Sequence, residues 1–527
     1  MSEPTFKPCM QHQPLLFPPD ISDLIPENAM VRVVDALVDD LGTQKLRGLY
    51  PGGGAPAYDP SMMLKVVLFA YASKIYSSRG IAKATRENIN FMWLCGLHPL
   101  DHNTVNRFRS ERIAPVFEEV FTGIVLLLAE QGYISLDTYF LDGTKIEANA
   151  NKFSFVWKKS TDRYQGALRD RVHALLSAID EMEDEEEALA PEEPGEIDAE
   201  RIAEAARRIN ERLAEREKDK QGQNQDLEKE LRQAAKKLQG DYLARMQKYE
   251  AQQEIFAGRN SFSKTDRDAT FMRLKDDYMG NGQLKAAYNI QVGTENQFVI
   301  ASSVHERPGD TACTVAHCEH VKELFGRLPR NVVADAGYGS EENYAYFDRE
   351  GVEAYVKHSE FFRECRNRKW REDEMRVANW AYLEDEDAYV CPEGRLLPFL
   401  RESKTTSDLG FESTTRIYGC SDCSDCTKRG RCMKSKNPDA RRTVQINPRL
   451  SFFKERASGM LHTEIGSELR KRRGTDVETV FGDIKRNALF TRFSLRGKTK
   501  VTLEWLLVAA GHNIRKMAAA NARRAEA

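Results

Sequence analysis

Three acidic residues are placed where a carboxylate could do chemistry. Asp142 ends the apolar run of "TYFLDGTKIEANA", Asp335 ends that of "RNVVADAGYG", and Glu478 lies in "GTDVETVFGDIKRN". If they converge, such carboxylates can hold two Mg2+ ions roughly 3.5 to 4 Å apart, an arrangement that serves phosphodiester cleavage and formation. Magnesium prefers oxygen ligands and keeps several waters, which leaves room for a phosphate. Each acid also has a structural interpretation: Asp142 with the following glycine is a common turn pair, Asp335 could cap a loop, and Glu478 could be a surface acid.

Basic residues accompany the third acid. Drawn as an α-helix, residues 474–493 carry Glu478, Lys485 and Leu489 on one face, so an ammonium lies two turns from the carboxylate. Lys485 is therefore expected to hold a phosphate near the acids. Further phosphate contacts are predicted for Arg472 and Arg473, in the upstream "RKRR", and for Arg486.

Half of the cysteines lie in one short segment. Cys391 stands in "CPEG", and "CSDCSDCTKRGRC" supplies Cys420, Cys423, Cys426 and Cys432. Steps of two residues between thiolates let neighbours reach one tetrahedral Zn2+, at about 2.3 Å per Zn–S bond. We expect a structural zinc that folds residues 385–435, with the subset of ligands left open, against the alternative of free or redox-active cysteines. An all-thiolate site leaves no open position for a substrate.

The elements that would position these groups follow from periodicity and turn residues. Residues 19–130 read as helical, a strand leads to Asp142, and strands are expected at 284–293 and 297–306. A helix at 311–326, a strand ending at Asp335, a further helix, and an apolar helix at 502–517 follow. Between the first two strands, residues 165–255 form a charged, helical insertion, which suggests a hairpin or small coiled coil. The order predicts a mixed α/β sheet interrupted by a large insert.

Within the N-terminal helices, "SSRGIAKATRENINFMWLCGLHPLDHNTVNRFRSERI" predicts two helices separated by a break at 96–99, with Asp101 as the second N-cap. This layout is typical of a helix-turn-helix. In that interpretation Val105 and Phe108 pack inward, while Asn103, Arg107 and Arg109 face a DNA groove. An ordinary amphipathic helix pair is the alternative.

The overall charge gives no direct support to a nucleic-acid partner. Lys and Arg number 78 against 81 Asp and Glu in 527 residues, a formal net charge of −3, although residues 469–500 are locally basic. The N-terminus does not read as a signal peptide, and the longest apolar runs fall short of the roughly 18 residues that span a bilayer. We expect a soluble, cytoplasmic protein.

Taken together, these segments resemble the DDE-class transposases of bacterial insertion sequences, and in particular the eleven-eighty-two group. The resemblance rests on "YDPSMMLKVVLFAYA", "FLDGTKIEANANK", "FMRLKDDYMGNGQLKAAYNIQVG", "VVADAGYGSEENY", the cysteine cluster and "VETVFGDIKRN". The related signature is Tyr, two residues, Arg, three residues, Glu, six residues, Lys. Glu478 and Lys485 keep the final spacing, whereas Lys471 and Gly474 stand at the Tyr and Arg positions.

The resemblance implies a ribonuclease-H-like core in which Asp142, Asp335 and Glu478 are the catalytic triad and bind Mg2+ or Mn2+. It implies a helical DNA-binding domain at 1–130, a catalytic domain made of 131–160, 261–350 and 461–527, a helical insertion at 161–260 and a cysteine-rich insertion at 351–460. The implied function is binding of terminal inverted repeats, DNA cleavage and strand transfer into target DNA, by a homodimer on DNA. An inactive DNA-binding regulator and a metal-dependent nuclease without strand transfer are the alternatives.

Overall fold

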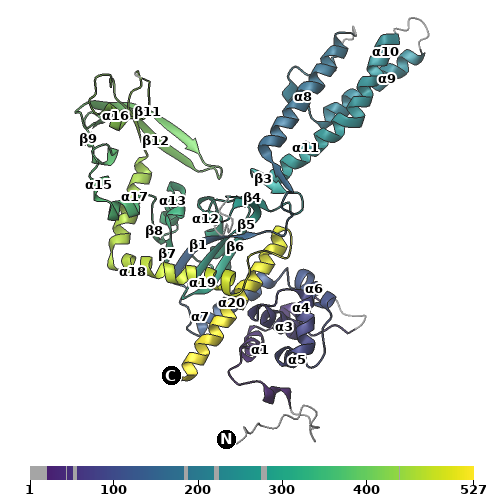
Figure 1. Cartoon of the computed structure of the whole chain (residues 1–527), viewed down its shortest axis with the longest axis vertical. Coiled ribbons are helices and arrows are strands. Elements are labelled where there is room, and N and C mark those ends of the chain that lie inside the picture. The colour runs from purple at the N-terminus through teal and green to yellow at the C-terminus, as the bar shows by residue number, and fades with distance from the viewer. Residues whose placement is uncertain are drawn as a thin grey trace, which may run out of the picture.

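The computed structural model describes residues 20–42, 44–50, 56–182, 188–218, 225–274, 282–437 and 439–526. Figure 1 shows a central sheet with the N-terminal helices below it and two projections that leave it in different directions. Residues 183–187 and 219–224 of the charged insertion, and residues 275–281 of the segment "FMRLKDDYMGNGQLKAAYNIQVG", lie outside the described residues. No described helix is long and apolar enough to cross a membrane.

The central sheet is mixed, as predicted. Its strands are β1 (Thr138–Glu147), β4 (Thr270–Arg273), β5 (Leu284–Glu295), β6 (Phe298–His305), β7 (Asn331–Ala334) and β8 (Glu353–Val356). They lie in the order β5–β1–β7–β8, and both β4 and β6 pair with the outer side of β5. The β1–β7 and β7–β8 pairs are parallel, whereas β5 is antiparallel to each of its partners.

Strand β1 does not end at Asp142. It continues through Gly143, which pairs with Gln291 of β5, as far as Glu147. The turn interpretation of this pair is therefore wrong, and the glycine has another reason: a Cβ at position 143 would lie 2.3 Å from Oδ1 of Asp310.

The N-terminal part is helical, as predicted. Its helices are α1 (Met30–Leu41), α2 (Gln44–Gly48), α3 (Pro60–Ala72), α4 (Ser78–Glu87), α5 (Ile89–Leu94), α6 (His102–Arg107) and α7 (Phe117–Glu130). Asp59 accepts hydrogen bonds from the first backbone N–H groups of α3, and Pro60 opens the helix. Helix α3 is buried on most sides because α20 (Lys498–Glu526) packs against both α3 and β6. This contact joins the N-terminal helices to the central sheet.

Two helices follow the order expected around β7. They are α12 (Thr314–Phe325), after β6, and α13 (Glu341–Arg349), after β7. The predicted helices at 311–326 and 502–517 are confirmed, the second as part of the longer α20.

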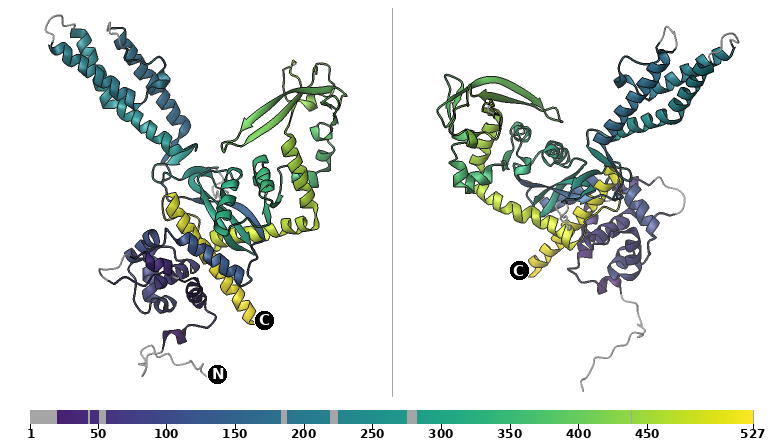
Figure 2. Two further views of the ribbon diagram at one scale, coloured as in Figure 1. Left: turned by 180° about the vertical axis from the view of Figure 1, so that it is seen from behind. Right: turned by 45° about the horizontal axis from the view of Figure 1, so that its top comes forward.

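The predicted charged insertion is a helical arm. It consists of α8 (Lys158–Asp180), α9 (Ala199–Lys218), α10 (Gln225–Lys237) and α11 (Leu243–Phe256). The arm has its own apolar core, to which Leu168, Ile209 and Leu231 belong. It joins the rest of the chain through the short pair β2 (Phe155–Trp157) and β3 (Ser261–Ser263). Both views in Figure 2 show the arm extending away from the central sheet.

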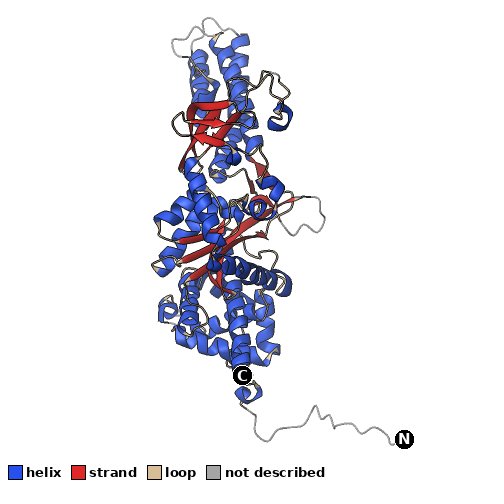
Figure 3. Ribbon diagram, turned by 90° about the vertical axis from the view of Figure 1, so that its left-hand side faces the viewer, coloured by secondary structure: helices blue, strands red, loops and turns tan. Residues whose placement is uncertain are grey.

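The second insertion contains a sheet that the sequence did not predict. Its strands are β9 (Ala381–Leu383), β10 (Ala388–Val390), β11 (Leu396–Thr406), β12 (Glu412–Gly419) and β13 (Thr443–Ile446), all antiparallel and adjacent in that order. Short helices α14 (Phe361–Arg366), α15 (Arg368–Arg371) and α16 (Arg429–Cys432) flank it, and α17 (Pro448–His462) and α18 (Glu464–Arg473) lead back to the central sheet. Figure 3 shows the two sheets as separate groups of strands.

Candidate active site

The register of the parallel strands brings the two predicted aspartates together. Phe140 of β1 pairs with Val333 of β7, and Val333 pairs with Tyr355 of β8. These three side chains share one apolar cluster, so they lie on the same face of the sheet. Two residues further along the chain stand Asp142, within β1, and Asp335 and Lys357, which directly follow the last residues of β7 and β8. Because side chains alternate along a strand, these three residues form the next row on that face, which we call the acidic row.

A guanidinium bridges the two aspartates of the acidic row. Nη2 of Arg473 lies 2.8 Å from Oδ2 of Asp142 and 3.7 Å from Oδ2 of Asp335. The other oxygen of each carboxylate accepts a backbone N–H, that of Gly143 for Asp142 and that of Gly337 for Asp335, each at 2.8 Å. The Asp142 side chain is 11% exposed and that of Asp335 is 41% exposed. One edge of the row is therefore open to solvent.

Glu478 lies on the helix that covers this face. The helical segment runs from Glu464 to Asn487 and includes two π-helical turns, η8 (Gly474–Glu478) and η9 (Asp483–Asn487), on either side of α19 (Thr479–Gly482). The predicted helix is confirmed, but it is not a regular α-helix. A π turn joins residues five apart, so Arg473 and not Gly474 lies one turn before Glu478. Val477 packs into the cluster beneath Phe140, and Glu478 is exposed.

Lys357, the third member of the acidic row, lies near enough to both Asp335 and Glu478 for their charges to affect its pKa. Burial lowers the pKa of Lys357, and so do the charges of Arg473 and Arg470, whereas the charges of Asp335 and Glu478 raise it. The ammonium therefore senses both carboxylates. The three carboxylates are nevertheless spread out: among the described residues, one group of three His, Cys, Asp or Glu ligand atoms lies within 4.8 Å of one another, and it consists of His358, Glu360 and Glu364.

Sequence reasoning missed Lys357. Its strand, "EAYV", is short and lacks a turn signal, so it was not recognised as a neighbour of β7. Only the parallel register shows that this lysine follows Asp335 across the sheet.

The other acids on the covering helix have structural partners. Asp483 accepts from His512 Nδ1 at 2.8 Å and from Arg515 at 2.6 Å, and these two partners, His512 first, lower its pKa. Asp476 accepts the backbone N–H of Gln297 at 2.6 Å, and burial raises its pKa. Both acids tie the helix to other elements, which distinguishes them from the exposed Glu478.

Two segments of the chain match family models. Residues 390–518 match a model described as "Transposase DDE domain", and residues 19–111 match one described as "Transposase domain (DUF772)". Together they indicate an insertion-sequence DDE transposase. The first match contains Glu478, Arg473 and the cysteine segment, and the second ends in the turn after α6, while Asp142 and Asp335 lie outside both. Assignment to the eleven-eighty-two group stays a prediction.

Searches of curated proteins and of solved structures found no match.

The phosphate-binding residues predicted for the transposase lie on the same covering helix. Lys485 is partly exposed and Arg486 fully so, both in η9. Arg472 lies over the ring of Phe140, 5.3 Å from its centroid, and donates to Oδ1 of Asn296 at 3.3 Å. Arg473 contacts the aspartates directly.

The N-terminal helices confirm the predicted cap but correct one DNA contact. Asp101 accepts the N–H of Asn103 at 2.7 Å, and Val105 and Phe108 are buried. Asn103 is exposed, and so is Arg107, which lies 3.7 Å from Glu111.

Arg109 does not face a groove, because it is 4% exposed. The helix changes to a π turn at Phe108–Arg112, and the guanidinium of Arg109 points inward. There it donates to the hydroxyl of Tyr71 at 3.0 Å and the carbonyl of Tyr76 at 2.8 Å. Its role is to stabilise the helical bundle of the transposase.

The five clustered cysteines gather at one end of the five-stranded sheet. The pKa of Cys420 is raised to about 11, first by burial and also by the neighbouring Cys423 and Cys391. Burial also raises the pKa of Cys432, against the charge of Arg442, and Cys426, Cys391 and Cys423 contribute. The thiols therefore lie close enough to interact, and their chemistry fits Zn2+. No three of their sulfur atoms lie within 4.8 Å of one another, so a bound ion would have to draw them together, and the zinc site stays a prediction.

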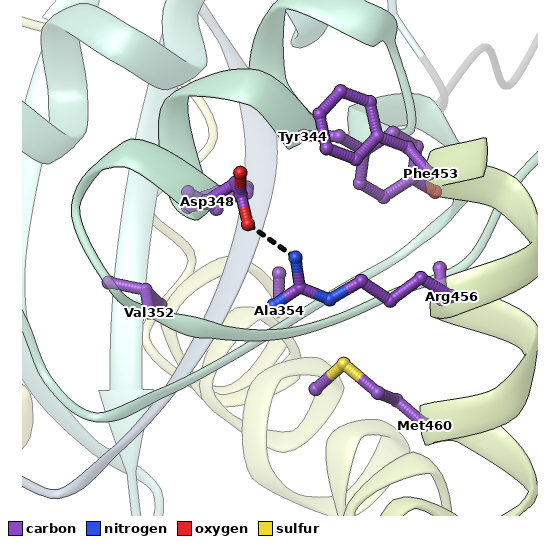
Figure 4. A pocket seen from close by; sticks show the side chains of 9 residues that line it. Tyr344, Asp348, Val352, Ala354, Phe453, Arg456 and Met460 are labelled. Carbon is purple, nitrogen blue, oxygen red and sulfur yellow. Dashed lines mark hydrogen bonds and ion pairs between the residues drawn. The ribbon is translucent and has the colours of Figure 1, made fainter. Parts of the chain in front are cut away.

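The pocket in Figure 4 lies away from the acidic row. It is formed between α13 and α17, where Tyr344 stacks on Phe453 and Arg456 pairs with Asp348. Its volume is about 20 Å3, which is room for about one water molecule. The pocket is a packing feature of the helix interface and not a substrate site.

Proposed function

We propose that this transposase binds the terminal inverted repeats of its own insertion sequence, hydrolyses phosphodiesters at the ends, and joins the freed 3'-hydroxyls to target DNA. The observation that carries this proposal is the acidic row, in which Asp142 and Asp335 occupy adjacent parallel strands beneath the helix that bears Glu478. The strand order β6–β5–β1–β7–β8, in which β5 runs opposite to the other four strands, supports a ribonuclease-H-like core.

Asp142, Asp335 and Glu478 would hold Mg2+ or Mn2+. The guanidinium of Arg473 supports this fit, because a cation already bridges the two aspartates at the position where a divalent ion would neutralise them. When bound, such ions would activate the attacking water or 3'-hydroxyl and stabilise the leaving oxygen.

The cations around the acidic row would hold the DNA backbone. Lys357 and Lys485 are partly exposed, and we propose that both contact phosphate oxygens near the scissile bond. The π turn η8 suggests that Arg473 takes the part of the signature arginine that Gly474 cannot play, because the extra residue in the turn moves Arg473 into phase with Glu478. Asn103 and Arg107 of the N-terminal helices would contribute to binding of the repeats.

The two ends of the insertion sequence must be brought together, so we propose that the protein forms a homodimer on DNA. The helical arm is the proposed contact between the two protomers. The arm has its own core and joins the sheet through β2 and β3, so deletion of residues 165–255 removes a separate unit. We expect the deletion variant to bind a single end but to form no paired-end complex in gel-shift assays. Paired ends formed as well as by the full chain would contradict the role of the arm.

Substitution of the three acids tests the proposed chemistry. Asp142→Asn, Asp335→Asn and Glu478→Gln should each abolish Mg2+-dependent nicking of DNA taken from the regions that flank the gene, while end binding is retained. Glu468→Gln is a matched control, because Glu468 is an exposed acid on α18. If a variant nicks normally, the substituted residue does not belong to the metal site.

A second assay distinguishes the alternative functions. Joining of pre-cleaved ends to target DNA would identify a transposase and not a nuclease, whereas a wild-type chain that binds DNA but never nicks it would be a regulator.

A further inference from the structure

Short helices α14 and α15 present a basic surface that the proposed chemistry does not use. Residues 363–371 carry five cations, Arg363, Arg366, Arg368, Lys369 and Arg371, and a single acid, Glu364. All five cations are exposed. Arg368 pairs with Glu372 at 2.8 Å. For Arg363, Arg366 and Lys369, no carboxylate within the described ranges lies at ion-pair distance. Arg371 donates to the carbonyl of Glu364 at 2.5 Å. The other three positive charges are left to solvent within residues 363–369.

An exposed aromatic ring stands among these charges. Phe362 is 50% exposed. Nζ of Lys357 lies 4.9 Å from its ring centroid, and Cζ of Arg366 lies 5.6 Å from the same centroid. An exposed ring flanked by cations is the combination that holds single-stranded nucleic acid, because bases stack on the ring and phosphates meet the charges. Duplex binding alone would not need the ring.

This surface starts at the acidic row. Lys357 is the third member of the row, beside Asp335, and also the cation over Phe362. Arg470 of the covering helix lies 5.2 Å from the ring centroid of Phe361, which is 6.2 Å from that of Phe362. In Figure 1, α15 lies next to α17 and β9. A strand that leaves the carboxylates past Lys357 would meet Phe362 first and the free cations next.

We propose that Phe362, Arg363, Arg366 and Lys369, the α14–α15 surface, bind the unpaired DNA strand that adjoins the scissile phosphate. The proposal rests on the function proposed for the acidic row. The ring stacks on a base and the three cations contact successive phosphates, so that the strand is held open while it is cut or joined.

The test measures binding of the full-length chain to labelled poly(dT) and to a random-sequence duplex over a range of salt concentrations. For single strands, the slope of log K against log salt concentration decreases in magnitude by about 0.7 for each phosphate contact that is lost. The triple variant Arg363→Ala/Arg366→Ala/Lys369→Ala should therefore decrease the magnitude of this slope on poly(dT) by about 2. Phe362→Ala should weaken poly(dT) binding by about 10-fold and duplex binding far less, and Phe362→Tyr, which keeps a ring, should restore it. The matched control is Lys229→Ala/Lys236→Ala/Lys237→Ala, which removes three exposed charges from α10 of the arm.

Each outcome decides the proposal. An equal change of slope in the α10 control, or an equal loss on duplex and single strand for Phe362→Ala, would overturn it. Nicking of end DNA by the wild type, together with unchanged poly(dT) binding by the variants, would reject the α14–α15 surface and leave the proposed function in place. If the variants lose salt-dependent binding to poly(dT) but the wild type does not nick end DNA, the α14–α15 surface is supported and the proposed transposase function is rejected.

Discussion

Two ends of the molecule gather candidate metal ligands, and they hold them differently. At the acidic row, Arg473 bridges Asp142 and Asp335, and backbone N–H groups bind the remaining oxygens, so groups of the protein hold both carboxylates in place. At the end of the five-stranded sheet, thiols are the main ligands, and the burial of Cys420 and Cys432 raises their pKa values. The apolar cluster of the five-stranded sheet is small, and Cys420 and Cys423 themselves belong to it. The carboxylates of the acidic row are therefore held by groups of the protein, and we expect a bound ion to matter more for folding at the cysteine end.

The largest effect is expected from removal of zinc at the cysteine end. Structural zinc contributes about 10 kcal/mol to the folding of small sites, so Cys423→Ser/Cys426→Ser should lose the metal and expose residues 385–435 to protease. Zinc content and limited proteolysis measure both. The control is Asp142→Asn, which should keep its zinc and its protection. A wild-type chain that contains no zinc and still resists protease in this segment would contradict the prediction.

A smaller loss of stability is expected when Arg473 is replaced, because the acidic row should then depend on a bound metal ion as the cysteine end does. Arg473→Gln removes the cation between two neighbouring carboxylates, which should cost about 3 kcal/mol of unfolding free energy in metal-free buffer. Added Mn2+ should recover more stability in this variant than in the wild type, because the ion no longer competes with the guanidinium. Thermal unfolding with and without Mn2+ is the measurement.

Arg472→Gln is the control for this prediction, because Arg472 lies on the same helix but over Phe140. If Mn2+ stabilised the wild type and Arg473→Gln equally, Arg473 would not occupy the place of the metal.

The sequence predicted the acidic row better than the groups around it. Asp142 and Asp335 were found because each follows an apolar run, a local signal, and Glu478 because the helix pattern continues through it. The place of Lys357 next to Asp335 depends on parallel pairing between distant segments, which no local pattern contains. Arg109 was misplaced because a π turn changes the phase of an α-helical drawing.

The five-stranded sheet was missed for a further reason. Its longest strand, β11, is mostly exposed and therefore lacks the alternation of buried and polar residues that marks a strand packed on a core.

The smallest effect concerns Asp483, the acid that anchors the covering helix. Its folded-state pKa is lowered by His512 and then by Arg515, so its ion pairs stabilise the fold at pH values above the unfolded pKa of about 3.9 and lose that contribution as the pH falls below it. Asp483→Asn should therefore be less stable than the wild type by about 1 kcal/mol at neutral pH, and this difference should narrow below about pH 4. Denaturant unfolding at several pH values measures it.

Asp476→Asn is the matched control on the same helix, with the opposite sign. Burial raises the folded-state pKa of Asp476, so its contribution is present at low pH and is lost as the pH rises through that pKa. The free energy of unfolding of the wild type should therefore rise relative to that of Asp476→Asn as the pH falls, whereas relative to Asp483→Asn it should fall. Parallel profiles for the two variants would show that neither carboxylate controls the acid sensitivity of the helix.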